Sequence, residues 1–421
     1  MQLAYGRTGL ELDLNHEQWD VEVILPRDRP ALVDSEAAFR AAAAAPLGSP
    51  SLVALGQQVG QGKVCIAIAD HTRPVPDYLL VPWIVAALGV CDAQVTIVIG
   101  TGTHRGSTPT ELLRMLGPAR DRFTVINHDC QDDAALADCG RSVCGGPILL
   151  HRAWIEADLR LATGFIEPHF FAGFSGGSKA VVPGIAGLAT VQHFHRASLI
   201  AHPRTTWGAT SDNPLQQLTR RMTAVCPPQA IVNVLLNHAQ KITHIFVGDM
   251  IAAHDAGCAQ ALHEALRPVP RRYPVVVTTN SGAPLDQNFS QTVKGISAAA
   301  RIVEPGGTII VASACDAGLP GEGAFARLLA DPSDNATLLA AILASRETPH
   351  DQWQVQTLLQ CASVARIVLI SALSVADRRL TRTAHADSVE VALADAHRAL
   401  GPGRHPLAIL PLGPLTIPTA P

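Results

Sequence analysis

The sequence predicts an α/β fold made of two domains, each built on a parallel sheet, that face each other across a cleft. Short β-branched runs alternate along the chain with stretches rich in Ala and Leu. This alternation is typical of Rossmann-like parallel strands joined by crossover helices. It stops and restarts near residue 270, and the 421 residues are enough for two domains that each bury a core.

The first half is expected to begin with four buried strands, because its apolar, β-branched runs are short and evenly separated. These strands are expected at Val21–Leu25, Val64–Ile68, Val95–Ile99 and Phe123–Ile126. The helices between them are expected at Ser35–Ala45, Tyr78–Leu88 and Thr108–Met115. A second strand cluster is expected at Ile148–Trp154 and Leu159–Thr163.

The second half repeats the pattern, with strands expected at Pro274–Thr279, Thr308–Ala312, Ala365–Ile370 and Leu407–Leu410. Its helices are expected at Asn288–Arg301, Asn335–Ala344, Gln352–Cys361 and Val389–Leu400. Prolines and charges mark 267–273 as a linker between domains at 1–266 and 274–411. The proline-rich segment after Pro411 is expected to be an irregular surface tail.

The composition narrows the class of protein. The formal net charge is −4 and no basic face or long run of charge is present, which disfavours nucleic acid and membrane as partners. The N-terminal segment lacks the regions of a signal peptide, and the nine cysteines form no CxxC pair. We therefore expect a cytoplasmic protein with reduced thiols. The chain has 17 histidines, so the motif in which each histidine lies must indicate which of them are candidates for catalysis or metal binding.

Three segments follow predicted strands, where open α/β sheets bind their ligands. They are Asp70–Pro74, Gly100–Arg105 and Gly164–Lys179. In the first, Arg73 suits a phosphate or carboxylate and Asp70 suits a ribose hydroxyl, and a helix-capping Asp beside a surface Arg is an equal alternative. In the second, the glycine turn suits an anion, whereas a lone histidine such as His104 is more often structural than catalytic.

The third segment is the richest in chemistry. His169 precedes a glycine-rich bend, and Lys179 follows it among Gly, Val and Ala. Such surroundings disfavour the charged amine, which favours a nucleophile or a covalent anchor. The alternative is a lysine that pairs with an acid at the start of a helix. A phosphate-binding P-loop does not fit, because Ser178 intervenes and Ala180 replaces the magnesium-binding hydroxyl.

Two further pairs stand out. His193 and His195 are two residues apart, so they point in different directions and do not chelate one metal together. Gln291 and Lys294 are three residues apart near the start of a predicted helix, where they share a face that suits a carboxylate. An exposed polar helix face is an equal alternative for this second pair.

Taken in order, these segments resemble the nickel-pincer lactate racemase family over about residues 10–400. The motifs are Asp70-x-Thr-Arg-Pro, Gly102-Thr-His-Arg, Glu167-Pro-His-x3-Gly-Phe-Ser-Gly-Gly-x-Lys, Pro183-Gly184, Gly282-x-Pro-Leu-Asp-x-Asn with Gln291 and Lys294, and Asp351-Gln-Trp. Each motif alone is weak, and their shared order and spacing carry the resemblance.

The resemblance implies a cofactor, a nickel pyridinium-3,5-bisthiocarboxylic acid mononucleotide (the nickel pincer), covalently linked to a lysine. Lys179 matches that lysine. His195, sixteen residues further on, matches the histidine that ligates the nickel, and Trp353 matches a tryptophan near the metal.

The nucleotide end of this cofactor is implied to lie at the first segment. Asp70, Thr72 and Arg73 match residues that hold the ribose and phosphate, and Arg73 is also expected to reach the substrate carboxylate. The resemblance implies two kinds of partner, a small 2-hydroxy acid and the enzymes that make the cofactor.

The activity implied is that of an isomerase, a racemase or epimerase that inverts C2 of a 2-hydroxy acid. One histidine takes the hydroxyl proton while a hydride passes from C2 to the cofactor, and the hydride then returns to the other face with a second histidine as acid. His104 and His169 match these two histidines. Gln291 and Lys294 match contacts to the substrate carboxylate from the C-terminal domain, which is expected to close over the active-site cleft.

Two departures from the family pattern bear on the substrate. Ser178 stands where many relatives carry a basic residue, and Ser290 stands where lactate-acting members often carry an aromatic one. The smaller Ser290 is expected to widen the pocket toward a longer or more polar acid. Lactate, malate, aryl lactates and sugar acids all stay open as substrates.

Two rival hypotheses accompany this interpretation. The first is a hydroxy-acid lyase or dehydratase that uses Lys179 to form a Schiff base. The second is a non-catalytic carrier of a nickel nucleotide that uses Asp70 and Arg73 as a clamp.

Overall fold

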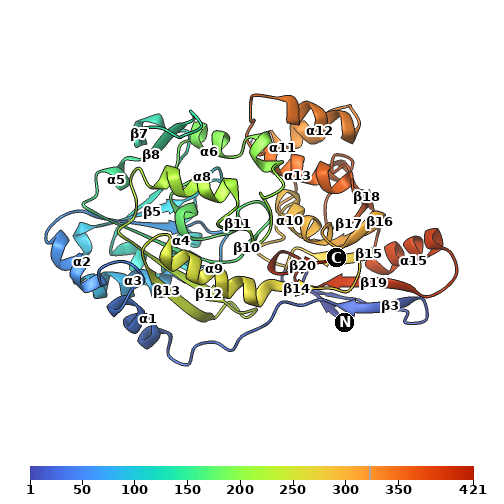
Figure 1. Cartoon of the computed structure of the whole chain (residues 1–421), viewed down its shortest axis with the longest axis horizontal. Coiled ribbons are helices and arrows are strands. Elements are labelled where there is room, and N and C mark those ends of the chain that lie inside the picture. Colours follow the sequence, from blue (N-terminus) through green and yellow to red (C-terminus); the bar gives the residue numbers. More distant parts are fainter. Residues whose placement is uncertain (322–323) are drawn as a thin grey trace.

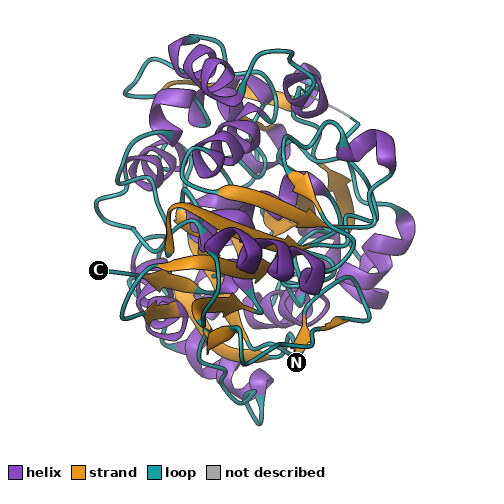
Figure 2. Ribbon diagram, turned by 90° about the vertical axis from the view of Figure 1, so that its right-hand side faces the viewer, coloured by secondary structure: helices purple, strands orange, loops and turns teal. Residues whose placement is uncertain are grey.

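The computed structural model describes residues 1–321 and 324–421, and it contains two large sheets with helices on their outer and inner faces (Figures 1 and 2). The first sheet has the strand order β13-β12-β9-β4-β5-β6 and is parallel apart from the β12–β13 pair. Its strands are β4 (Val64–Ala69), β5 (Val95–Gly100), β6 (Thr124–Asn127), β9 (Leu159–Phe165), β12 (Ala230–Leu236) and β13 (Ile242–Gly248).

The second sheet has the order β18-β17-β16-β15-β19-β3, and all its neighbours are parallel. Its strands are β3 (Trp19–Val23), β15 (Tyr273–Thr279), β16 (Val303–Ala312), β17 (Arg366–Ile370), β18 (Ala384–His385) and β19 (His405–Leu410). The expectation of an α/β protein with two parallel-dominated sheets is therefore confirmed.

Four small two-stranded sheets complete the strands. They pair β1 (Gln2–Leu3) with β2 (Leu10–Glu11), β7 (Leu136–Arg141) with β8 (Pro147–His151), β10 (Pro168–His169) with β11 (Gly173–Phe174), and β14 (Leu266–Pro268) with β20 (Ile417–Thr419). The strand expected at Ile148–Trp154 is thus shorter than predicted, because α5 begins at Arg152.

The helices before β14 lie around the first sheet, and most of those after it lie around the second (Figure 1). The first group is α1 (Ser35–Ala44), α2 (Leu52–Val59), α3 (Asp77–Leu88), α4 (Pro109–Leu116), α5 (Arg152–Ile155), α6 (Leu188–Phe194), α7 (Ala197–Ile200), α8 (Pro214–Thr223) and α9 (Ala252–Ala265). The second group is α10 (Phe289–Ala299), α11 (Phe325–Leu329), α12 (Asn335–Ala344), α13 (Gln352–Ala362), α14 (Val375–Arg378) and α15 (Val389–Leu400). Within the described residues, no helix is long and apolar enough to cross a membrane.

The hydrophobic core is arranged in three layers that follow the alternation of side chains along each strand. In β4, Ile66 and Ile68 face an outer cluster with α1–α3, whereas Cys65 and Ala67 face a central cluster. The central cluster continues without a break to residues of the second sheet such as Val276. The two sheets are therefore joined by a shared apolar core rather than by a linker alone.

The first strand departs from its expected place. The sequence assigned Val21–Leu25 to the N-terminal domain at 1–266, but β3 pairs with β19 at the edge of the second sheet. In Figure 1 the blue β3 lies beside the red β19, on the opposite side of the molecule from α1 and α2. That part of the expected division is wrong, because a short apolar run carries no information about which distant strand it will pair with.

The C-terminal tail also differs from expectation. The segment after Pro411 is ordered, with a short 3-10 helix at Gly413–Leu415 followed by β20. β20 pairs in parallel with β14, which includes the first residues of the expected linker 267–273. Ile417 is 1% exposed, so the expectation of an irregular surface tail is wrong. The tail instead packs along the first residues of the expected linker through the β14–β20 pair.

Shortening Ile417 to Ala is expected to destabilise the fold, because it leaves a cavity in the central cluster. A buried Ile→Ala change costs about 2–5 kcal/mol, which a thermal or urea unfolding experiment detects as a lower midpoint. Val375→Ala is the matched control, since Val375 is 69% exposed. An Ile417 variant as stable as the control would contradict a buried tail.

Candidate active site between the two sheets

A cavity of about 560 Å³ lies where the carboxyl ends of β9, β4 and β5 meet the second sheet's helices. The three segments predicted to bind ligands follow these three neighbouring strands, as expected. The helices α10 and α13 supply the opposite wall. Ten side chains singled out from the sequence line this cavity, namely Asp70, Thr72, Arg73, His104, His169, Lys179, His195, Gln291, Lys294 and Trp353.

His104 is held by a carboxylate. Its Nδ1 lies 2.7 Å from Oδ2 of Asp70, while the Asp70 Oδ1 accepts a 2.6 Å bond from the Thr72 hydroxyl. Burial alone would raise the pKa of Asp70, but the charge and hydrogen bond of His104, together with Arg73, hold it well below its usual range. A carboxylate at Nδ1 leaves Nε2 as the ring nitrogen of His104 that can exchange a proton.

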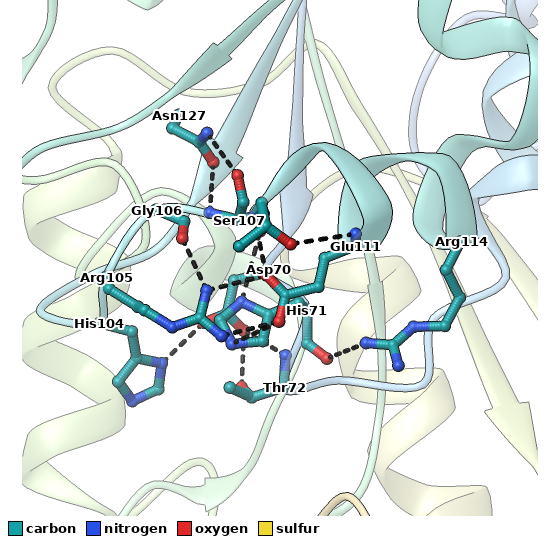
Figure 3. A network of polar contacts seen from close by, with 11 residues as sticks. Asp70, His71, Thr72, His104, Arg105, Gly106, Ser107, Glu111, Arg114 and Asn127 are labelled. Carbon is teal, nitrogen blue, oxygen red and sulfur yellow. Dashed lines mark hydrogen bonds and ion pairs between the residues drawn. The ribbon is translucent and has the colours of Figure 1, made fainter.

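Figure 3 shows how the loops of Asp70 and His104 are tied together through Glu111 at the start of α4. Arg105 donates two hydrogen bonds to Glu111, of 2.7 and 2.8 Å. The same carboxylate caps α4 by accepting from the backbone of Thr108, and it lies 3.8 Å from Nε2 of His71. The Arg105 hydrogen bond lowers the pKa of Glu111 to about 2. Glu111 therefore holds both Arg105, which follows His104, and His71, which follows Asp70.

Arg73 leaves a cationic nitrogen without a partner. Its Nη1 is buried and makes no hydrogen bond to any described residue, although the side chain lines the cavity. A buried guanidinium nitrogen without an acceptor is costly. An oxygen from an anionic ligand, a phosphate or a carboxylate, would satisfy it.

His169 lies on β10 and is held in one tautomer by its own turn. The backbone amide of Ala172 donates to its Nδ1 at 3.2 Å, so the neutral ring carries its proton on Nε2. Burial lowers the pKa of His169 well below its usual value, and the positive charges of Lys179 and Lys294 lower it further. His169 is thus neutral when the cavity is empty of anions.

Lys179 follows a tight glycine bend that places it in the cavity. Gly176 and Gly177 have φ values of 77° and 56°, which glycine adopts without strain. The amide of Gly177 donates to Asn233 Oδ1 at 2.8 Å, and a Cβ at Gly177 would come within 2.6 Å of the ring of His254. The bend therefore fits only as glycine between these two side chains.

The surroundings of the Lys179 amine disfavour its charged form. Burial lowers its pKa well below the usual value, and the charges of Arg73 and Lys294 act in the same direction. Its Nζ lies 5.7 Å above the ring of Phe171. The prediction that this lysine sits where charge is disfavoured agrees with the direction of this shift, and an uncharged amine is a nucleophile.

His195 has the opposite tautomer to His169. Its Nδ1 lies 2.9 Å from the carbonyl oxygen of Val191, so Nδ1 carries the proton and Nε2 keeps a free lone pair. Burial lowers the pKa of His195 to about 3. Trp353 of α13 stacks on the imidazole with ring centroids 4.1 Å apart. A neutral, oriented imidazole of this kind is suited to ligate a metal.

His193 lies apart from this site, as its spacing predicted. Its Nε2 is 3.1 Å from the Ser142 hydroxyl, and its ring packs against Gly146. Among the described residues, no group of three or more His, Cys, Asp or Glu side chains is placed to hold a metal ion. A metal at His195 would need further ligands from outside the chain.

The α10 wall contributes a second cation. Lys294 donates a 2.7 Å hydrogen bond to Gln291 Oε1, and both side chains are 7% exposed. The exposed polar face considered as an alternative is thus wrong. Burial lowers the pKa of Lys294 to about 7, and the charge of Arg73 contributes. Both side chains lie near the N-terminus of α10, where the helix dipole also favours an anion.

The sequence did not point to several of the lining or supporting residues. His350 and Gln354 flank Trp353 and line the cavity, and their place beside the Asp-Gln-Trp motif was the signal available. Asn233 and His254, which hold the glycine bend, carried no signal, because only the folded chain brings them to it.

Comparison with known proteins decides the family. Residues 5–208 match the family model described as the lactate racemase N-terminal domain, and residues 270–414 match the lactate racemase C-terminal domain. A lactate racemase of Lactiplantibacillus plantarum is 36% identical over 334 residues, which is 78% of each chain. The chain belongs to the lactate racemase family. It is accordingly an isomerase of the racemase class.

Other members of the lactate racemase family and a more distant structure agree with this. A lactate racemase of Thermoanaerobacterium thermosaccharolyticum is 32% identical over 381 residues, 88% of each chain. The solved structure of the lactate racemase apoprotein from that organism matches 99% of both chains, with a TM-score of 0.91 and 29% identity. A protein of Thermotoga maritima, at 18% identity and a TM-score of 0.68 over 88% of this chain and 96% of its own, shares the fold.

The two buried lysines are expected to react with an amine-specific reagent at lower pH than exposed ones, because a lowered pKa leaves more neutral amine. The chain has four lysines, and Lys63 and Lys241 are exposed. Competitive labelling with mass spectrometry across pH 5–11 should find half-labelling of Lys294 near pH 7, in line with its pKa of about 7, and labelling of Lys179 at lower pH than that of Lys63 and Lys241. Identical profiles for all four lysines would contradict the shifts.

Replacing Glu111 by Gln is expected to loosen the His104 loop, since it removes the charge that Arg105 and Thr108 bind. Racemisation should fall by about 10- to 100-fold, because small displacements of a reacting group cost that much. Hydrogen exchange at residues 101–106 should speed up. Asp92→Asn is the matched control, because it breaks the similar but exposed Arg122 pair. Equal behaviour of the two variants would rule out the tie through Glu111.

Proposed function

We propose that this racemase inverts C2 of a 2-hydroxy acid with a nickel-pincer nucleotide joined to Lys179. The observation that carries the proposal is that one cavity gathers a lysine whose charged form is disfavoured, a histidine with a free Nε2 lone pair, two more histidines and an unpartnered guanidinium nitrogen. Racemase relatives at 32–36% identity support the reaction class. They also favour racemisation over the lyase and the non-catalytic carrier.

The residues of the cavity fit this cofactor by their chemistry. The unpartnered Nη1 of Arg73 suits a phosphate, with Asp70 and Thr72 at the same end. The lowered pKa of the Lys179 amine favours its nucleophilic form, which suits a covalent bond to a carboxyl-derived carbon. His195 offers one nitrogen lone pair, and nickel accepts imidazole together with soft sulfur ligands that the chain itself does not provide.

When bound, the group would accept a hydride from C2 and return it, which spares the protein from removing a very weakly acidic C–H proton. The chain's own task is to move the hydroxyl proton. His104, with Asp70 at Nδ1, is oriented to take that proton at Nε2. The Nδ1 of His169 accepts from the amide of Ala172, which leaves Nε2 as the nitrogen that can exchange a proton. To donate a proton to the oxygen when hydride returns to the opposite face, His169 would enter that step as the imidazolium. In the reverse direction the two histidines exchange roles.

The substrate carboxylate is proposed to lie between Gln291, Lys294 and Arg73. Gln291 and Lys294 are buried, and a bound carboxylate would return Lys294 toward its charged form, because a nearby opposite charge favours the cation. With the carboxylate fixed, only the remaining substituents of C2 need to move when the opposite face is attacked. Trp353 in the surrounding wall is itself buried.

Two further proposals concern the cell. We propose that the chain receives its cofactor from separate biosynthetic enzymes, because none of its described residues clusters to assemble a metal group alone. The nine unpaired cysteines suit a reducing compartment, and we propose the cytoplasm.

The covalent anchor is tested by intact mass after co-expression with the cofactor-making enzymes. Wild type and Lys63→Ala are expected to carry the added mass of the cofactor, and Lys179→Ala to carry none. His195→Ala should keep the added mass but lose nickel by elemental analysis, whereas His193→Ala should keep both. Added mass on the Lys179 variant would overturn the anchor.

The proton-transfer roles are tested on variants that keep the cofactor. His104→Ala and His169→Ala should each retain nickel and added mass while racemisation falls by about 10²- to 10⁴-fold. Chiral chromatography of a single-enantiomer 2-hydroxy acid measures the rate. Full activity in either variant would eliminate the two-histidine scheme.

A further inference from the structure

We propose that Ser290, His350 and Gln354 form a polar subsite in the cavity that binds hydroxyl groups on the carbon chain of the substrate, so that the preferred 2-hydroxy acid is polyhydroxylated. This inference rests on the proposed function and names its substrate class. Ser290 lies on α10, Gln354 lies in the first turn of α13 and His350 precedes that helix, and all three line the cavity.

Gln354 supplies the first observation. The residue lies in the first turn of α13 and is 6% exposed. Its Oε1 is buried and has no hydrogen-bond partner among the described residues. Native proteins rarely leave a buried amide oxygen unpaired, because its lost hydration is then not replaced. A hydrogen-bond donor on a ligand in the cavity would satisfy the Oε1 of Gln354.

His350 supplies the second observation, four residues before Gln354. Its Nε2 is also buried without a hydrogen-bond partner among the described residues, and lies 3.6 Å from Oδ1 of Asp351. The ring is held beside Trp353, with centroids 6.1 Å apart, and the His350 carbonyl accepts from the amide of Ala324 at 2.9 Å. Two unsatisfied polar atoms thus belong to one short stretch of the wall.

Ser290 connects this wall to the proposed carboxylate site. It is 5% exposed, it lines the cavity, and it directly precedes Gln291 in the first turn of α10. A substrate whose carboxylate lies at Gln291 and Lys294 would therefore extend its chain past a small hydroxyl side chain. Ser290 leaves space for that chain and can itself form a hydrogen bond with it.

The chemistry of the three side chains determines which substituent beyond C2 of the substrate fits this part of the cavity. A serine hydroxyl and an amide each offer both a donor and an acceptor, and an imidazole adds a ring nitrogen, which suits hydroxyl groups that can donate or accept. An alkyl or aryl tail would leave Gln354 and His350 unpaired, and sites with polar groups of this kind discriminate against analogues that lack the hydroxyl. A second carboxylate on the tail would meet the carboxylate of Asp351, which also lines the cavity.

The test compares two acids that differ only in the tail hydroxyls, 2,3,4-trihydroxybutanoate and 2-hydroxybutanoate, with malate and 3-phenyllactate alongside. Epimerisation at C2 by the holoenzyme is followed by chiral chromatography. We expect kcat/KM for the trihydroxy acid to exceed that for each of the other three by about tenfold or more. An equal or higher value for any of those three would overturn the subsite.

Variants test whether the subsite causes the preference for the trihydroxy acid. Gln354→Leu should lower kcat/KM for the trihydroxy acid by about tenfold and leave that for 2-hydroxybutanoate within about twofold. Gln352→Leu is the matched control, since Gln352 lies on the same helix, is 2% exposed and does not line the cavity. Ser290→Ala gives a second, smaller change and should also reduce the preference. A loss that is equal for both acids in both subsite variants would contradict the inference.

Calorimetric titration of the full chain with the same two acids separates this inference from the proposed function. If protein that carries nickel and the added mass racemises none of the acids, the proposed function fails. The affinity ratio of the two acids and its loss in Gln354→Leu still decide the subsite. If racemisation occurs but the affinity ratio is near one, the subsite fails and the proposed function stands.

Discussion

The structure around the cavity depends on the convergence of three cations in a largely buried space. Arg73, Lys179 and Lys294 come from three different segments, and after burial it is their mutual repulsion that lowers the pKa of both lysines. Asp70, one of the acids near them, already binds His104. The cavity is therefore short of negative charge. It is a site that an anion completes, and a nucleotide phosphate with a substrate carboxylate would supply that charge.

Neither sheet could form this site alone. The first sheet carries the glycine bend, the histidines and the segment of Asp70, while α10 and α13 beside the second sheet carry Gln291, Lys294 and Trp353. The stacking of Trp353 on His195 joins the two parts at the imidazole that we propose as the metal ligand. Because a continuous apolar cluster runs from one sheet to the other, the two halves of the site are held against each other by the same core that stabilises the fold.

The sequence predicted much of this arrangement, for a physical reason. In a parallel sheet the carboxyl ends of neighbouring strands meet at one edge, so the order of strands and polar segments along the chain was enough to place the residues after β4, β5 and β9 together. Gln291 and Lys294 followed from their spacing on one helix. The resemblance to a known family then attached roles to these residues, and those roles stay proposals.

What could not be predicted depends on contacts between distant parts of the chain. β3 pairs with β19, and β20 pairs with β14, although the sequence of a short apolar run is compatible with many partner strands. Ile417 is one of a few isolated apolar residues in a proline-rich tail, so its burial had no local signal. The supports of the glycine bend, Asn233 and His254, are likewise ordinary residues in sequence and become specific only where Gly177 leaves room for them.

The pairing of β3 with β19 has a consequence for folding during synthesis. Trp19 lies opposite His405 in that pair, so β3 is synthesised early but cannot pair until β19, near the end of the chain, has also been synthesised. All strands of the first sheet lie between them in sequence, and this sheet can form while the second is still being translated. β3 stays an unpaired apolar segment for most of that time. The molecule is therefore assembled from its middle outward, and the second sheet closes only when the chain is nearly complete.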